Sequence, residues 1–142
     1  MDIKLLIIDD DPVHHKLVEL VIHQSALRIE YQSFFHASDG LAYILDNNDI
    51  ISLPDLVLLD LDMPLISGWG FLELLEAMSP CLGKQIDIII LTSSISLADK
   101  EKASTYNCVK GFFSKPFNNQ ILQDIINSPF ASVNKAAKYY NN

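Results

Sequence analysis

Short apolar runs alternate with amphipathic segments along most of the chain. Four runs are mostly apolar and end in polar or charged residues: Ile3–Ile8, Leu56–Leu59, Ile86–Leu91 and Val109–Phe113. Continuous apolar runs of this length are typical of parallel strands that helices cover on both faces. A fifth run, Tyr31–Ala37, is more mixed, which predicts a strand nearer to an edge of the sheet.

The segments between these runs have helical spacing. Pro12 fits the first turn of a helix, because a proline needs no hydrogen-bond partner there, and apolar side chains follow it at three-to-four spacing. Four more segments predict helices: Asp39–Asp46, Trp69–Met78, Leu97–Tyr106, and a last one through Ile126 capped by Asn118 or Asn119. This alternation predicts an α/β fold, with a parallel sheet, right-handed crossovers and helices on both faces.

The size and composition of the chain indicate one globular domain. It has 142 residues, of which 49% are hydrophobic, and this is enough to bury a sizeable core. Clear periodicity is lost over Ser128–Asn142, which predicts a frayed tail, with an extra docking helix as the alternative. The formal charge of −8 argues against direct contact with a nucleic-acid backbone.

Cysteines and apolar stretches favour a reducing, cytoplasmic location. Cys81 and Cys108 form no CxxC pair, so they predict neither a zinc site nor a disulfide and are expected to be small packing residues. The first apolar run is too short for a signal peptide and ends in acids. No apolar stretch reaches the roughly 18 residues that a membrane span needs.

Polar residues that suit phosphoryl chemistry follow four of the predicted strands. They are Asp9, Asp10 and Asp11 after the first, Asp60 and Asp62 after the third, Thr92, Ser93 and Ser94 after the fourth, and Ser114 and Lys115 after the fifth. Ligands of open α/β sheets bind at the carboxyl ends of the strands, so these side chains are expected at one edge. Clustered carboxylates favour a bound Mg²⁺ or Mn²⁺, and a carboxylate beside a metal can attack phosphorus to form an aspartyl phosphate.

Four segments resemble the signature segments of response-regulator receiver domains of two-component signalling. They are Ile7-Ile8-Asp9-Asp10-Asp11-Pro12, Leu58-Leu59-Asp60-Leu61-Asp62-Met63-Pro64, Ile90-Leu91-Thr92-Ser93-Ser94 and Lys115-Pro116-Phe117. The resemblance covers roughly residues 3–127. It implies a flavodoxin-like, doubly wound sheet of five parallel strands in the order 2-1-3-4-5, as in stand-alone chemotaxis regulators. Residues 1–128 are then the receiver domain and 129–142 the tail.

The resemblance also implies the residues that handle the phosphoryl group. Asp60 would accept it, Thr92 would hydrogen-bond to it and Lys115 would pair with it. The bond between Lys115 and Pro116 is cis in the family. Phe112 stands at the position of an aromatic switch residue that turns inward as the threonine moves. A plain core role is the alternative for Phe112.

The resemblance places the metal among the same acids. Asp10 would be a direct ligand, Asp9 would act through a metal-bound water, and Asp60 and the main-chain carbonyl of Asp62 would complete the protein ligands. Asp11 is expected to cap the following helix instead, because an aspartate before a proline is a good helix start.

Some positions depart from the family pattern. Ile66-Ser67-Gly68 stands where members commonly carry Met-Asp-Gly or Met-Asn-Gly. Asp62 places a carboxylate two residues after the acceptor, a position that influences attack of water on the phosphoryl group, and Ser94, two residues after Thr92, is the other such position. The remaining candidates are expected to have structural or surface roles: Asp55, Asp87, His14, His15, His23 and His36.

Two other classes of protein share part of this pattern. Asp60-Leu61-Asp62 superficially resembles the DxD motif of haloacid-dehalogenase phosphatases, but in that family the motif follows the first strand, and here the acidic pair comes first. A degenerate receiver that serves only as an interaction module would lack the acceptor or a metal-binding acid, and both are present.

The resemblance implies protein partners. A histidine kinase or histidine phosphotransfer protein would supply the phosphoryl group, and a downstream protein target would respond to it. The chain is expected to act as a monomer or a phosphorylation-dependent dimer, without direct contact with nucleic acid or insertion into a membrane.

Overall fold

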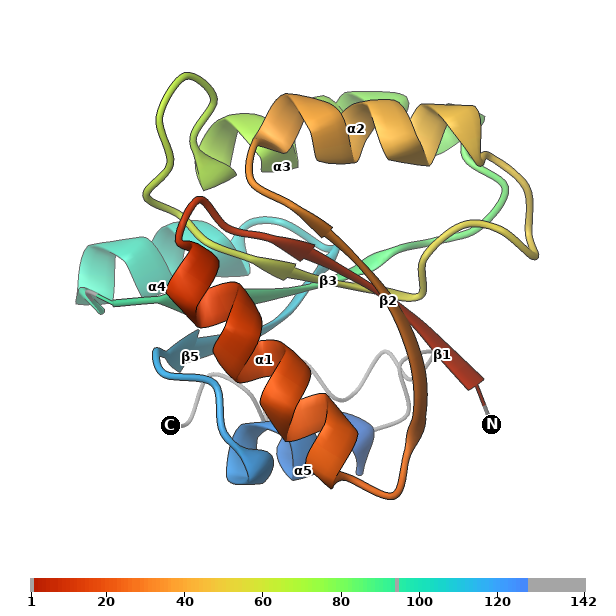
Figure 1. Ribbon diagram of the computed structural model, residues 1–142. Helices are drawn as coiled ribbons and strands as arrows, with labels where there is room; N and C mark the ends of the chain where they lie inside the picture. Colours follow the sequence, from red (N-terminus) through yellow and green to blue (C-terminus); the bar gives the residue numbers. More distant parts are fainter. Residues whose placement is uncertain (1, 94, 128–142) are drawn as a thin grey trace.

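One parallel sheet organises the computed structural model, which describes residues 2–93 and 95–127 (Figure 1). Its strands lie in the order β2-β1-β3-β4-β5. They are β1 (Asp2–Ile8), β2 (Arg28–Phe34), β3 (Leu56–Leu59), β4 (Asp87–Thr92) and β5 (Val109–Ser114). All neighbouring strands are parallel, which confirms the predicted fold class and strand order, and β2 is an edge strand as its mixed composition indicated.

Helices cover both faces of this sheet. They are α1 (Pro12–Gln24), α2 (Ala37–Asp46), α3 (Gly68–Met78), α4 (Leu97–Ser104) and α5 (Asn119–Ile126), with a short 3₁₀ helix, η1 (Ser79–Cys81), after α3. Figure 1 shows α2 and α3 on one side of the sheet and α1 and α5 on the other. The side chain of Asp11 accepts the N–H of Val13 and caps α1, and that of Asn118 accepts the N–H of Ile121 and caps α5.

The alternation of side chains along the strands divides the core in two. In β1, Leu6 and Ile8 face the cluster beneath α2, α3 and α4, whereas Leu5 and Ile7 face the cluster beneath α1 and α5. Because both faces are covered, the central strand β3 is buried at every position. The sequence therefore shows an unbroken apolar run at this strand.

Several expected boundaries were wrong by a few residues. The edge strand β2 begins at Arg28 and ends at Phe34, because its alternating half-exposed side chains do not form the apolar run that was used to place it. Helix α2 begins at Ala37, and α4 ends at Ser104. Cys81 is exposed, so it is no packing residue, whereas Cys108 packs against the core.

Some expectations fall outside the described residues. These concern Ser94 and the tail over residues 129–142. Within the described part of the chain, the helices are all too short or too polar to cross a membrane.

Candidate functional site

The sheet brings the predicted residues together at the carboxyl ends of its strands. Asp9 directly follows β1, and Asp60 directly follows β3. The N–H of Asp60 donates to the carbonyl of Ile8 over 3.0 Å, which extends the pairing of these two strands to the acidic residues. The N–H of Lys115 likewise donates to the carbonyl of Thr92 over 2.8 Å. Main-chain hydrogen bonds thus join Asp60 to the end of β1 and Lys115 to the end of β4.

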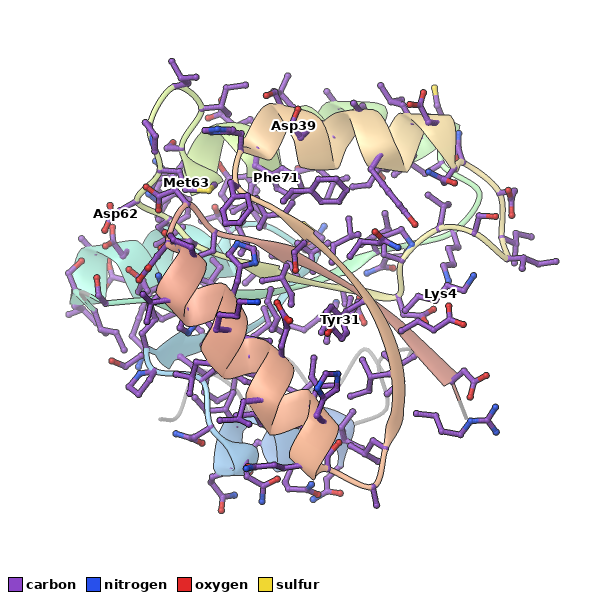
Figure 2. The ribbon with its side chains drawn as sticks, in the orientation of Figure 1. Lys4, Tyr31, Asp39, Asp62, Met63 and Phe71 are labelled. Atoms are coloured by element: carbon purple, nitrogen blue, oxygen red, sulfur yellow. The ribbon has the colours of Figure 1, made fainter. Side chains whose placement is uncertain are left out.

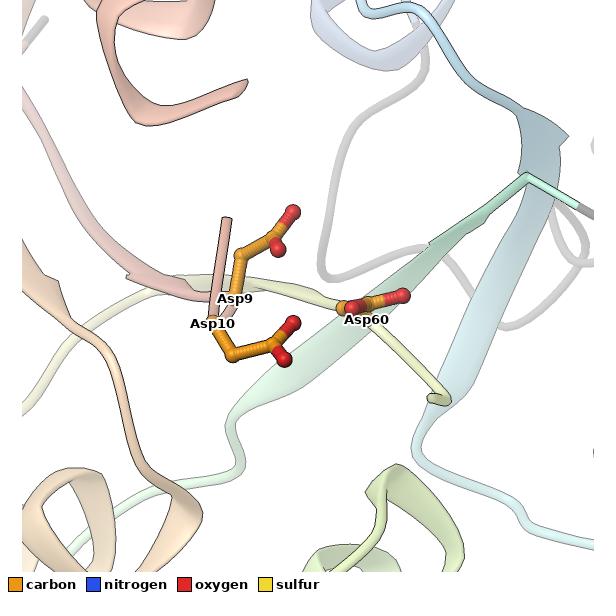
Figure 3. Close-up of side chains that lie close together, drawn as sticks. All are labelled: Asp9, Asp10 and Asp60. Atoms are coloured by element: carbon orange, nitrogen blue, oxygen red, sulfur yellow. The ribbon is translucent and has the colours of Figure 1, made fainter. Parts of the chain in front are cut away.

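Three carboxylates form the centre of the site. Asp9, Asp10 and Asp60 each offer an oxygen atom, and these atoms lie within 4.8 Å of one another (Figure 3). Asp9 is 3% exposed and Asp60 is 5% exposed, whereas Asp10 is open to solvent. An all-oxygen donor set with one solvent-accessible side suits Mg²⁺, which takes carboxylate ligands and keeps several of its waters. The residues present therefore fit a hard divalent cation.

Lys115 supplies a positive charge between two of these acids. Its Nζ lies 2.8 Å from Oδ2 of Asp9 and 3.5 Å from Oδ1 of Asp60. The peptide bond between Lys115 and Pro116 is cis, as the resemblance implied. The lysine side chain is 15% exposed, so its charge acts in a site that is largely shielded from water.

The close carboxylates titrate differently because their surroundings differ. Burial raises the pKa of Asp9, but hydrogen bonds from His14 and Lys115 outweigh it and lower the pKa of Asp9 below its usual range. Burial, followed by the negative charge of Asp9, raises the pKa of Asp60 well above its usual range, and Lys115 only partly opposes this. Asp60 is therefore a destabilised anion that gains from a neutralising cation.

Gly68 lets Asp60 lie close to the start of α3. A Cβ atom at this position would lie 2.5 Å from the carbonyl oxygen of Asp60 and 2.8 Å from Cα of Leu61. The N–H of Gly68 donates to the carbonyl of Leu61 over 3.0 Å. This close backbone contact leaves no room for a side chain, which explains why a glycine stands at this position.

Three further residues with expected roles lie near these carboxylates. Thr92 and Phe112 are the expected switch residues, and Asp62 is expected to influence attack of water on the phosphoryl group. Thr92 is 1% exposed at the end of β4. Phe112 is fully buried in the core beneath α4, so its inward position is already occupied, and its role as a switch stays a prediction. The N–H of Asp62 lies 3.4 Å from Oδ1 of Asp60, and its side chain is exposed at this end of the sheet (Figure 2).

His14 and His15, for which structural or surface roles were expected, lie in direct contact with the site. Nδ1 of His14 lies 2.9 Å from Oδ2 of Asp9, and Nε2 of His15 lies 2.6 Å from the main-chain oxygen of Asp9. Both histidines are buried. The sequence feature that could have indicated this contact is their position in the first turn of α1, which begins directly after the acidic residues. The expected surface role holds for His23 and His36, which are exposed.

The chain belongs to the response regulator receiver domain family, whose model matches residues 5–127. Its structure is similar to that of a two-component response regulator from Cytophaga hutchinsonii, with a TM-score of 0.81 and 25% identity over 89% of this chain and 95% of that one. It has the fold of a chemotaxis-regulator-like receiver domain protein from Methanospirillum hungatei, with a TM-score of 0.70 and 22% identity over 97% of this chain and 98% of that one.

Relatives in sequence are longer proteins. The chain is 32% identical over 87% of its length to the transcriptional regulatory protein FlgR of Helicobacter pylori, and this match covers 28% of that protein. It is 27% identical over 88% of its length to the hybrid signal transduction histidine kinase I of Dictyostelium discoideum, where the match covers 7%. The chain thus spans a small part of these relatives. It is itself a receiver domain of two-component signalling.

Proposed function

We propose that Asp60 accepts a phosphoryl group from a histidine kinase or phosphotransfer protein and that the domain signals through protein contacts that depend on this phosphorylation. The observation that supports the proposal most is the convergence of three carboxylates and Lys115 at one edge of the sheet. Family membership supports a phosphoacceptor domain in general, and the position of Asp60 inside this group supports it as the acceptor.

The reaction needs a nucleophile, an electrophilic phosphorus and a means of neutralising charge. An oxygen of Asp60 attacks phosphorus, and the bond between phosphorus and the donor nitrogen or oxygen breaks, its electron pair leaving with the donor. Lys115 then moves its charge from the carboxylates toward the phosphoryl oxygens, and the hydroxyl of Thr92 donates a hydrogen bond to another of them. The short distances from Nζ to both acids support this role, because they place the lysine charge beside the proposed nucleophile before the reaction.

Asp9, Asp10, Asp60 and the carbonyl of Asp62 would hold Mg²⁺ or Mn²⁺. When bound there, a divalent cation would supply positive charge that offsets the charge of the acids and of the phosphoryl oxygens. Asp10 is the exposed member, so it lies where a hydrated cation would arrive. The raised pKa of Asp60 also favours this site, because a nearby cation keeps the nucleophile ionised.

Acetyl phosphate or phosphoramidate with Mg²⁺ tests this proposal. We expect a hydroxylamine-labile adduct on Asp60 by mass spectrometry, and none after Asp60→Asn. The matched control is Asp55→Asn, because Asp55 lies outside the acidic group and should leave the adduct unchanged. Absence of an adduct in the wild-type protein, with no effect of Mg²⁺, would favour an interaction module. Turnover of phosphomonoesters beyond slow self-hydrolysis would favour a phosphatase.

A further inference from the structure

The buried histidine pair at the start of α1 has no part in the proposed phosphoryl chemistry, yet it contacts Asp9 from two directions. His15 donates from Nε2 to the main-chain oxygen of Asp9 over 2.6 Å, while His14 lies 2.9 Å from the carboxylate. The two histidines differ in their hydrogen bonding: both ring nitrogens of His14 have partners, whereas Nδ1 of His15 is buried without one.

The hydrogen bonds of His14 define which ring nitrogen carries the proton. The N–H of Phe117 donates to Nε2 of His14 over 3.3 Å. A main-chain N–H can only donate a hydrogen bond, so the nitrogen that it meets must be an acceptor. Nε2 is therefore the acceptor and Nδ1 the donor to Oδ2 of Asp9. His14 is 6% exposed, so water does not compete for either bond.

These two bonds join both halves of the site. Asp9 belongs to the acidic group after β1, whereas Phe117 follows Lys115 and Pro116 in the loop before α5. Oδ1 of Asp9 accepts the N–H of Asp11 over 2.9 Å, and Oδ2 accepts from both His14 and Lys115. When Lys115 turns toward a phosphoryl group, His14 is the side-chain donor that remains on Oδ2.

We propose that His14 is a positioning residue, which holds the carboxylate of Asp9 in its metal-binding orientation while Lys115 serves the phosphoryl group. The inference rests on the proposed function. His14 touches neither the phosphoryl group nor the cation, and it acts through Asp9. His15 fixes the main chain at the same residue, so the two histidines hold Asp9 at different atoms.

Three substitutions of His14 separate positioning from packing. The amide nitrogen of asparagine occupies the place of Nδ1, so His14→Asn keeps a donor to Asp9 and loses the bond from Phe117. His14→Gln reaches toward Phe117 instead and loses the donor to Asp9. His14→Leu loses both. A packing role would make the first two variants similar, because each removes one hydrogen bond from the same buried side chain.

We expect His14→Gln and His14→Leu to weaken Mg²⁺ binding by about tenfold, which is the lower end of the effect of losing an outer-shell partner at a metal site. His14→Asn should bind Mg²⁺ like the wild-type protein. The dissociation constant for Mg²⁺ is measured by calorimetry on the full chain. The variants should rank in the same order by their rates of phosphorylation by acetyl phosphate as by their affinities for Mg²⁺. His23→Asn is the matched control, because His23 is exposed on the same helix.

The outcomes distinguish this inference from the proposed function. If the wild-type protein forms the adduct on Asp60 but His14→Gln binds Mg²⁺ as His23→Asn does, the positioning role is wrong. The same holds if His14→Asn and His14→Gln lose affinity equally. Thermal melting without Mg²⁺ identifies any variant that fails to fold, and the ratio of the Asn and Gln affinities then decides the question. If the wild-type protein neither binds Mg²⁺ nor forms the adduct, the proposed function itself fails.

Discussion

The two ends of the sheet carry the same types of residue in different arrangements. At the amino ends of the strands, Asp55 accepts the N–H of Lys4 over 2.9 Å and pairs with Lys84. Asp87, at the start of β4, is buried near Lys110. In Figure 2, Lys4 and Asp62 mark these opposite ends of the domain. Acids and lysines are thus nearly balanced at the amino ends.

At the carboxyl ends of the strands, by comparison, negatively charged side chains outnumber positively charged ones. Three carboxylates converge there, and Lys115 contacts two of them. Among the described residues, this is the only group of three or more potential metal-binding side chains with ligand atoms so close together. The comparison shows that an acid at a strand end becomes a functional candidate when its charge is left without enough partners, because that charge then favours a cation.

Loss of Lys115 should have the largest effect. Lys115→Met removes the charge between Asp9 and Asp60, and we expect phosphorylation by acetyl phosphate to slow by about 100-fold, the usual cost of a lost group that stabilises transition-state charge. Lys84→Met removes the lysine at the other end, and it should leave the rate unchanged and lower the free energy of unfolding by at most about 1 kcal/mol. Equal rates for the two variants would mean that the two ends do not differ in function.

Removing the crowded acid should stabilise the metal-free protein. The pKa of Asp60 is raised on folding, so its stabilising contribution is present at low pH and is lost as the pH rises through its folded pKa. We expect Asp60→Asn to raise the free energy of unfolding by about 2 kcal/mol at pH 8 without Mg²⁺, and by little at pH 4. Urea denaturation at both pH values measures this.

Asp55, at the amino ends of the strands, provides a control in which the free energy of unfolding should change in the opposite direction. Asp55→Asn should lower the free energy of unfolding, because Asp55 has a lysine and a main-chain N–H as partners. Addition of Mg²⁺ should stabilise the wild-type protein and this variant, but have little effect on Asp60→Asn. Stabilisation of all three by Mg²⁺ would place the cation elsewhere.

Asp87 tests whether burial of a single carboxylate, outside the acidic group, also makes its replacement by asparagine stabilising at high pH. Burial raises its pKa to about 6, while Lys110 opposes the shift. Its contribution is also lost as the pH rises, here between the unfolded value of 3.8 and about 6. We expect Asp87→Asn to raise the free energy of unfolding by about 1 kcal/mol at pH 8 and by little at pH 4, with no dependence on Mg²⁺. A dependence on Mg²⁺ would contradict the contrast between the ends.

The sequence predicted the fold well where strands are buried on both faces. At β3, the apolar run and the observed strand have the same bounds, Leu56–Leu59, because every side chain there is covered. It placed β2 three residues late, because the edge strand alternates between half-buried and exposed side chains. Helix caps were predictable from local chemistry, as Asp11 and Asn118 show.

Residues of the site were predictable from their positions at strand ends, but their partners were not. Asp9, Asp60 and Lys115 meet because parallel strands bring their carboxyl ends to one edge. The contact between His14 and Phe117 joins residues far apart in the sequence, and it depends on how α1 and the loop before α5 pack together. Helical periodicity gives the face of a side chain, not the group that it meets on another segment.

The smallest expected effect concerns Asp62, which is exposed beside Asp60, the proposed acceptor. Its carboxylate lies two residues after Asp60, where a side chain can affect the approach of water to the phosphoryl group. Asp62→Arg adds bulk and positive charge, so we expect the aspartyl phosphate to persist about fivefold longer, which corresponds to about 1 kcal/mol in the barrier. Asp62→Asn keeps the size and should change the lifetime less. Loss of the adduct after removal of acetyl phosphate gives both rates. Unchanged lifetimes in both variants would show that the exposed charge of Asp62 does not affect hydrolysis. The excess negative charge at the carboxyl ends would then matter only through Asp9, Asp10 and Asp60.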